Sequence, residues 1–155
     1  MGQLTASEVD ALRAALDDEY HAWATYNQVI ADFGETPPFS NIREAEARHI
    51  EALRSLYARY GLAMPDNPWP GKVTRYANLQ EACAAGVAAE IENGALYERL
   101  LASTQRPDIL IVFRNLQEAS QQRHLPAFQR CVERGSGGSG RGGGARRRWG
   151  QRSRP

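Results

Sequence analysis

Residues 44–51 read Glu-Ala-Glu-Ala-Arg-His-Ile-Glu, and two polar side chains of this stretch fall within an apolar pattern. Glu46 and His49 alternate by three and four residues with apolar positions on both sides, which are Phe39, Ile42, Leu53, Leu56 and Tyr60. This spacing is typical of the buried face of an amphipathic helix. A carboxylate and an imidazole are costly to bury unless something compensates them. The stretch therefore predicts a helix, from about Thr36-Pro37 to Gly61, with a polar site in its buried face.

Three more segments carry the same helical period, over about 5–33, 78–104 and 107–134. No segment alternates with the period of two that is typical of strands. Residues 62–77 include three prolines, which exclude a single helix there. A connection of this length is typical of a crossover that runs along a bundle. The sequence predicts an all-α four-helix bundle with a long crossover between helices two and three.

Signals at the helix ends support this division. Thr5 and Glu8 have capping-box spacing, as do Asn78 and Glu81. Thr36 is the expected N-cap of the second helix, because proline at the next position suits a first helical residue.

The charge is divided between a body and a tail. Residues 135–155 hold six arginines and no acid, which leaves 13 Lys and Arg against 18 Asp and Glu in residues 1–134. We expect a bundle domain over 1–134 and a disordered, basic Gly/Arg-rich tail over 135–155. The tail is either a solvated extension or a weak contact for nucleic acid or another anionic surface.

Two further features concern the compartment. No apolar run approaches the ~20 residues of a membrane span, and the N-terminal residues lack the secretory pattern. We therefore expect a cytoplasmic protein without a membrane partner. Cys83 and Cys131 lie far apart in the sequence, so we expect two free, buried thiols rather than a disulfide.

Each expected helix carries an ionisable side chain in its apolar face. The set comprises Glu19, Glu46, His49, Glu90 and His124. Three carboxylates that face one core would repel each other, and the first three helices offer no Lys or Arg at these levels. A pair of divalent metal ions would supply the missing charge and accept both kinds of ligand.

The two halves of the chain repeat this pattern. Tyr26 follows Glu19 by seven residues, as Tyr97 follows Glu90. The second and fourth helices then carry Glu46-x-x-His49 and Gln121-x-x-His124. The chain reads as two copies of one helical hairpin joined by the crossover.

With this pattern the sequence resembles the ferritin-like di-iron carboxylate superfamily, which includes bacterioferritins and rubrerythrins. NIREAEARHIEALRSLYARYGL at 41–62 and HLPAF at 124–128 more narrowly resemble an uncharacterised bacterial ferritin-like domain family. The resemblance implies a ferritin-like antiparallel four-helix bundle. It also implies that Glu19 and Glu90 are terminal carboxylates, that Glu46 bridges two metals, and that His49 and His124 each bind one.

The chain departs from that pattern at Gln121, where the second bridging Glu is expected. Glu118 is near in sequence, but on a regular helix it lies about 120° around the axis from His124. It could therefore act as the second bridging carboxylate only if the helix is locally distorted. Tyr26, Tyr97 and Asn93 are candidates for hydrogen bonds to the ligands, with Gln121 and Glu118 as further neighbours. Asp17 and Asp18 are expected on a solvated face.

The preferred hypothesis is a dinuclear iron or manganese site that performs redox chemistry with oxygen or peroxide, as a ferroxidase or a peroxidase. The chain lacks Cys-x-x-Cys pairs, so the electron donor would be external. One alternative is a non-catalytic bundle with a degenerate site whose Arg-rich tail contacts anionic partners. Another is a single structural or sensing ion held by Glu46, His49 and one more carboxylate. The sequence leaves the oligomeric state open, with a homodimer as one option.

Overall fold

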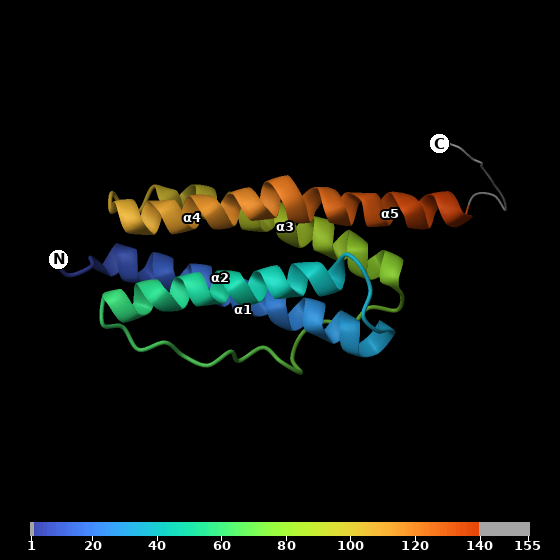
Figure 1. Ribbon diagram of the computed structural model, residues 1–155, viewed down its shortest axis with the longest axis horizontal. Helices are drawn as coiled ribbons and strands as arrows, with labels where there is room; N and C mark the ends of the chain where they lie inside the picture. Colours follow the sequence, from blue (N-terminus) through green and yellow to red (C-terminus); the bar gives the residue numbers. More distant parts are fainter. Residues whose placement is uncertain (1, 140–155) are drawn as a thin grey trace.

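The described part of the chain folds into four long helical rods. The structure, a computed structural model, describes residues 2–139. The helices are α1 (Ala6–Phe33), α2 (Phe39–Arg59), α3 (Leu79–Leu101), α4 (Pro107–Ala119), the π-helical turn η1 (Ser120–His124) and α5 (Leu125–Ser139). In Figure 1, α4, η1 and α5 follow one another as a single rod. The described residues contain no strand, so the prediction of an all-α bundle is confirmed.

The predicted crossover is present between α2 and α3. Figure 1 shows the connection running along the bundle, so that α2 and α3 point in the same direction while α1 and the α4–α5 rod run the opposite way. The connection is fixed to α1: the Tyr20 hydroxyl donates to the Pro65 carbonyl (2.6 Å), and Asn67 Nδ2 donates to the Tyr20 carbonyl (3.0 Å). The crossover therefore lets the α1–α2 hairpin and the hairpin of α3 with the α4–α5 rod turn their equivalent apolar faces toward one core.

The helix ends follow the sequence signals in two of three cases. Thr5 and Glu8 form a complete capping box, and the Asn78 side chain accepts a hydrogen bond from the Glu81 backbone (2.9 Å). The prediction for Thr36 is wrong, because α2 begins only at Phe39 and has no side-chain cap. The reason is Pro38, since a proline disfavours the α conformation in the residue before it.

Among residues 2–139, the core has two apolar clusters. One is built around Leu12, Leu16, Leu53 and Phe113 near one end of the bundle. The other is built around Tyr26, Phe39 and Phe128 toward the opposite end, and includes Ile30, Ile42 and Cys83. The ionisable side chains predicted from the sequence fall between the two along α1, α2 and α3. An apolar layer on both sides strengthens any electrostatic interaction between them.

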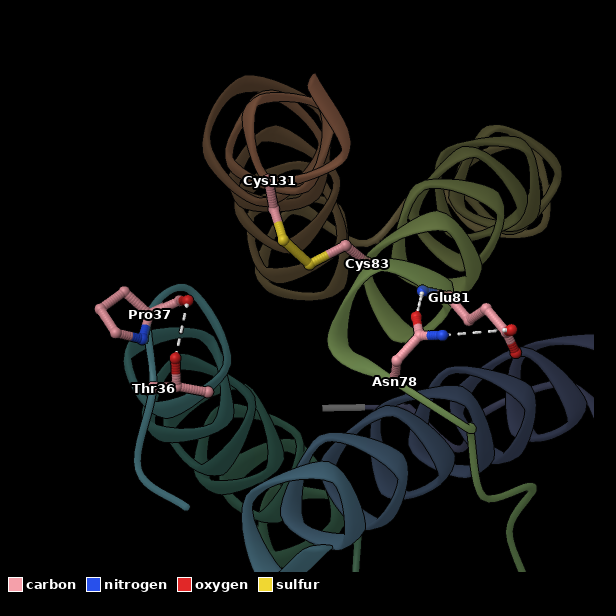
Figure 2. Close-up of a disulfide and its surroundings, with 6 residues drawn as sticks. All are labelled: Thr36, Pro37, Asn78, Glu81, Cys83 and Cys131. Atoms are coloured by element: carbon pink, nitrogen blue, oxygen red, sulfur yellow. Dashed lines mark hydrogen bonds between the residues drawn. A yellow bond between two sulfur atoms is a disulfide. The ribbon is translucent and has the colours of Figure 1, made fainter. Parts of the chain in front are cut away.

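A disulfide joins α3 to α5 (Figure 2). Cys83 and Cys131 lie 48 residues apart in sequence, with Cα atoms 6.0 Å apart. The prediction of two free thiols is therefore wrong. Sequence separation misled it, because the packing of α3 against α5 brings the two positions together.

The last helix extends beyond its predicted end, since α5 continues to Ser139 instead of stopping at Arg134. The predicted disorder of the tail otherwise falls on 140–155, outside the described residues. Among residues 2–139, no helix combines the length and apolar character that a membrane crossing requires.

Candidate metal centre

Five ionisable side chains from all four rods meet at one level of the bundle. They form two groups, Glu19 with Glu46 and His49, and Glu46 with Glu90 and His124. In each group one ligand atom per residue lies within 4.8 Å of the others. Glu46 belongs to both groups, so its two oxygens face two neighbouring positions. The structure thus brings together all five residues that the sequence singled out as candidate ligands.

These side chains are shielded from solvent. Glu19 is 1% exposed, Glu46 and Glu90 are each 2% exposed, and His124 is 4% exposed. His49 is somewhat more open, with 12% of its side chain exposed. Three buried carboxylates so close together require compensating positive charge.

The two histidines approach the carboxylates through the same ring atom. His49 Nδ1 lies 3.0 Å from Glu19 Oε1 and 3.0 Å from Glu46 Oε1. His124 Nδ1 lies 3.5 Å from Glu90 Oε1 and 3.6 Å from Glu46 Oε2, and has no hydrogen-bond partner among the described residues. A buried ring nitrogen without a partner is costly. Binding of this nitrogen to a metal ion that Glu46 and Glu90 also bind would remove the cost.

The two tyrosines of the repeated pattern hold the terminal carboxylates. The Tyr26 hydroxyl donates to Glu90 Oε2 (2.6 Å), and the Tyr97 hydroxyl donates to Glu19 Oε2 (2.7 Å). Each tyrosine thus serves the carboxylate of the other half of the chain. Both hydroxyls are fully buried. Burial is the larger cause, and the negative charge of the neighbouring carboxylate the second, that raises the pKa of each tyrosine well above its usual range. They therefore act as hydrogen-bond donors in their neutral form.

Asn93 lies beside the site, as predicted. It also bonds to Asp18, which was not among the predicted site residues. Its Nδ2 donates to Glu19 Oε2 (3.3 Å) and to Asp18 Oδ2 (2.5 Å). Asp18 was expected on a solvated face, but it is half-buried against α3. Burial, followed by the charge of Glu19, raises the pKa of Asp18 to about 7. Asp17 is exposed, as expected, and accepts a hydrogen bond from Trp69.

The π-helical turn η1 decides which side chains of the fourth rod enter the site. The Leu125 backbone N–H bonds to the Ser120 carbonyl, five residues earlier, which widens the turn. Ser120 becomes buried, and its hydroxyl donates to Glu90 Oε1 (2.7 Å). Ser120 was missed by the sequence analysis, although it lies one turn before His124. Such turns are frequent at functional sites.

Neither predicted neighbour from this rod supplies a fourth carboxylate. Glu118 is exposed in spite of the local distortion. Gln121 Nε2 donates to the Glu90 carbonyl (2.7 Å) and to Ser120 Oγ (2.8 Å), so its amide secures the backbone of α3. The described site therefore offers three carboxylates and two imidazoles.

The carboxylates have unequal proton affinities. Burial would raise the pKa of Glu19, but hydrogen bonds from His49, Glu46 and Tyr97 outweigh it and hold this pKa at about 2. Burial, then the negative charge of Glu19, raises the pKa of Glu46 well above its usual range. Of Glu19 and Glu46, the shared carboxylate of Glu46 is thus the one that requires a positive neighbour to be ionised.

A small cavity of about 100 Å³ reaches the site between α1 and α3. Tyr26, Glu90, Asn93 and Thr25 line it. Asn93 Oδ1 and Thr25 Oγ1 are buried without hydrogen-bond partners among the described residues. The cavity is therefore polar on the side of Glu90 and has room for only a small molecule.

The donor set could hold divalent metal. Carboxylate oxygen and imidazole nitrogen without thiolate suit iron, manganese or zinc. Two groups that share one carboxylate provide two adjacent positions, and the unpartnered His124 Nδ1 faces one of them. The described residues thus form a carboxylate and histidine cluster that could hold metal.

Comparison with known proteins places the chain in a family. The model of the family described as "Uncharacterized protein domain (DUF2202)" matches residues 8–140. The chain belongs to the DUF2202 family. Its ligand candidates all lie within the matched range.

The fold of this chain has a solved counterpart. A crystal structure of a hypothetical protein from Methanococcus jannaschii is similar to this chain with a TM-score of 0.78 at 21% identity, covering 88% of this chain and 85% of that one. At that identity the likeness shows the fold alone. No curated protein sequence matches the chain.

Proposed function

We propose that this chain is a ferritin-like protein that binds two divalent metal ions, iron or manganese, and performs redox chemistry with oxygen or peroxide. The observation that carries the proposal is the position of Glu46 in both ligand groups. A carboxylate shared by two groups is the arrangement that a dinuclear centre needs. Its chemistry would be of the ferroxidase or peroxidase type.

The ligands divide into two sets around the shared carboxylate. Glu19 and His49 would hold one ion, Glu90 and His124 would hold the other, and Glu46 would bridge them. Two divalent ions against three carboxylates leave one net positive charge, which favours an anionic or polar oxidant. When bound, the metal pair supplies the electrons or the Lewis acidity that oxygen and peroxide chemistry requires.

The surrounding residues have defined tasks in this proposal. Tyr26 and Tyr97 orient the terminal carboxylates, and Ser120 holds the second oxygen of Glu90. Outer hydrogen bonds of this kind tune metal affinity. The cavity of about 100 Å³ beside Glu90 suits a small oxidant such as oxygen or peroxide. The reductant would be an external donor.

A second candidate is a non-catalytic bundle with a degenerate site. It is favoured by the fourth rod, where Glu118 is exposed and Gln121 is bonded to the backbone of α3. In that case the basic tail would recruit anionic partners such as nucleic acid. The tail beyond Ser139 lies outside the described residues, so this contact and a homodimer stay predictions.

Metal analysis of the full-length chain from iron-supplemented cells tests the proposal. Glu46→Ala removes the shared carboxylate, and Glu51→Ala on the exposed side of the same helix is the matched control. We expect about two metal ions per chain in the wild type and in the control, and a loss of both in Glu46→Ala. Oxygen and peroxide turnover would then be measured on the loaded protein.

The other outcomes favour the alternatives. One ion per chain would indicate a mononuclear structural or sensing site. A wild type that holds no more metal than Glu46→Ala would support the degenerate bundle.

A further inference from the structure

A basic groove lies between α2 and the η1–α5 segment, on the side of the bundle away from the small cavity. Its volume is about 430 Å³, within the range of small-molecule sites. Within residues 2–139, four arginines line it, namely Arg48, Arg123, Arg130 and Arg134, and no Asp or Glu does. The groove therefore concentrates positive charge in a hollow of ligand size.

The sequence explains why the hollow exists. Arg123, Ala127, Arg130 and Arg134 step by four, three and four, which places them on one face of the η1–α5 segment. Ala45 precedes Arg48 by three residues on the facing side of α2. Ala45 and Ala127 both line the groove, and their short side chains leave the space between the two helices open.

The four groove arginines lack carboxylate partners within the described residues, as do Arg13, Arg99 and Arg114, which lie outside the groove. Arg43, Arg54, Arg59, Arg75 and Arg106 each form an ion pair with a carboxylate. None of the four groove arginines forms an ion pair within residues 2–139. Like charges gathered without partners raise the free energy of the folded chain, and an anion between them would lower it. Guanidinium groups also match carboxylate and phosphate oxygens in a two-pronged geometry.

His124 connects the groove to the candidate metal centre. It is buried, it lines the groove, and its Nδ1 faces Glu46 and Glu90. A molecule held by Arg123 and Arg48 would thus lie against the outer side of the same imidazole. The small cavity beside Glu90 is lined by other residues, so the site has two separate approaches.

We propose that the groove binds a small organic anion with at least two negative charges on carboxylate or phosphate groups, and holds it beside His124. The binding itself needs only the arginines and the hollow. That the ligand lies next to a metal ion, and so serves as substrate or reductant of the centre, rests on the proposed function.

The binding test uses the metal-free, full-length chain and two probes, succinate for carboxylates and phenyl phosphate for phosphates. Nuclear magnetic resonance titration gives the Kd and the backbone amides that shift. Arg48→Gln with Arg130→Gln removes two groove charges, whereas Arg13→Gln with Arg114→Gln removes two exposed arginine charges elsewhere. Both double variants keep the Arg-rich tail, so their difference isolates the groove.

We expect at least one probe to bind, with shifts in residues 41–48 and 123–134. The groove variant should weaken binding about tenfold or more, and the control should stay within about twofold of the wild type, because two charge-assisted contacts are lost only in the first. Which probe binds more tightly assigns the ligand chemistry. The absence of binding by both probes at millimolar concentration, or equal weakening by both variants, would overturn the proposal.

A second measurement tests the position relative to the metal. Manganese-loaded protein should speed the relaxation of the bound probe's protons, and the groove variant should reduce that effect in proportion to its weaker binding. Bound probe without enhanced relaxation in protein that holds manganese would overturn the placement beside His124. Protein that takes up neither manganese nor iron would contradict the proposed function and leave the binding result standing.

Discussion

The Tyr26 hydroxyl on α1 donates a hydrogen bond to Glu90 Oε2 on α3, at 2.6 Å. Tyr97 on α3 returns the same contact to Glu19 on α1, at 2.7 Å. The repeated Glu-x6-Tyr spacing of the sequence is thus an exchange between two hairpins. Each half of the chain orients the terminal carboxylate of the other half.

Replacing either tyrosine with phenylalanine should weaken metal binding. Tyr26→Phe and Tyr97→Phe each remove a donor that orients a ligand, and such outer contacts change affinity by about 10–100-fold. Competition with a chelator would measure the Kd. Tyr57→Phe is the matched control, because the Tyr57 hydroxyl is buried without a partner among residues 2–139. Equal affinities in all three variants would show that the tyrosines only fill the core.

A carboxylate at position 121 should not repair the site. Gln121 Nε2 donates to the Glu90 carbonyl at 2.7 Å, and Gln121→Glu would set an acceptor against that acceptor. We expect a loss of stability of about 1–3 kcal/mol and no gain in metal content. Chemical denaturation and metal analysis would measure these. A gain in bound metal would mean that the side chain can turn into the site.

The regular helical period predicted most of the site. Glu19, Glu46, His49 and Glu90 all follow from alternation by three and four residues, which is valid wherever the helix is regular. Ser120 did not follow, because η1 widens the turn and no residue type marks a π-helical turn in one sequence. The Glu-x-x-His spacing indicated Gln121, three residues before His124, as the neighbour of the site on this rod.

Contacts between helices were the second feature that the sequence could not predict. Cys83 and Cys131 meet only because α3 packs against α5, and Asp18 turns toward Asn93 only because α1 packs against α3. Periodicity assigns a residue to a face, but it does not give the level at which two faces meet. The sequence likewise shows the four groove arginines as charged residues, but it does not show that they line one groove.

Two glycines of α3 should respond differently to substitution. A Cβ at Gly86 would lie 2.7 Å from the Phe128 ring, whereas one at Gly94 would lie 2.5 Å from the Gln121 side-chain amide. The aromatic ring is rigid and buried, so Gly86→Ala should cost about 1–3 kcal/mol of stability. The flexible Gln121 can move, so Gly94→Ala should cost less.

Gly94→Ala should instead affect the site. Its movement of Gln121 would break the hydrogen bond to the Glu90 carbonyl and disturb the Glu90–His124 side of the cluster. We expect weaker binding of one metal ion, measured by chelator competition, with a melting temperature near that of the wild type. The opposite ranking, with Gly86→Ala milder in its effect on stability, would contradict the close packing of Phe128 against Gly86.

The disulfide should contribute to stability without contributing to metal binding. It closes a separation of 48 residues, and cross-links of this kind stabilise by roughly 2–4 kcal/mol. Cys83→Ala with Cys131→Ala should lose about that amount, and reductant should bring the wild type to the same level. Metal content should not change in the double variant. If reductant leaves the unfolding midpoint of the wild type unaltered, the bond is not formed in solution.

The stability of the bundle should depend on acid through Glu8. Its carboxylate accepts hydrogen bonds from Thr104 (2.6 Å), from the Thr5 backbone (2.9 Å) and from Arg106 (3.1 Å). These contacts, Thr104 first, lower the pKa of Glu8 from 4.5 to about 2. A lowered pKa means that the unfolded chain binds the proton more readily. The stabilisation is therefore fully present above the unfolded-state pKa of 4.5 and is lost as the pH falls through about 2.

Glu8→Gln isolates this effect. At neutral pH the variant should be less stable than the wild type by about 1–3 kcal/mol, because buried contacts to an ionised carboxylate are lost. The difference should shrink below pH 4.5 and approach zero only below pH 2, where Glu8 of the wild type is protonated as well. Urea denaturation across this range measures it, with Glu81→Gln in the exposed first turn of α3 as the control. A difference that stays constant with pH would show that Glu8 acts through packing and capping and not through its charge.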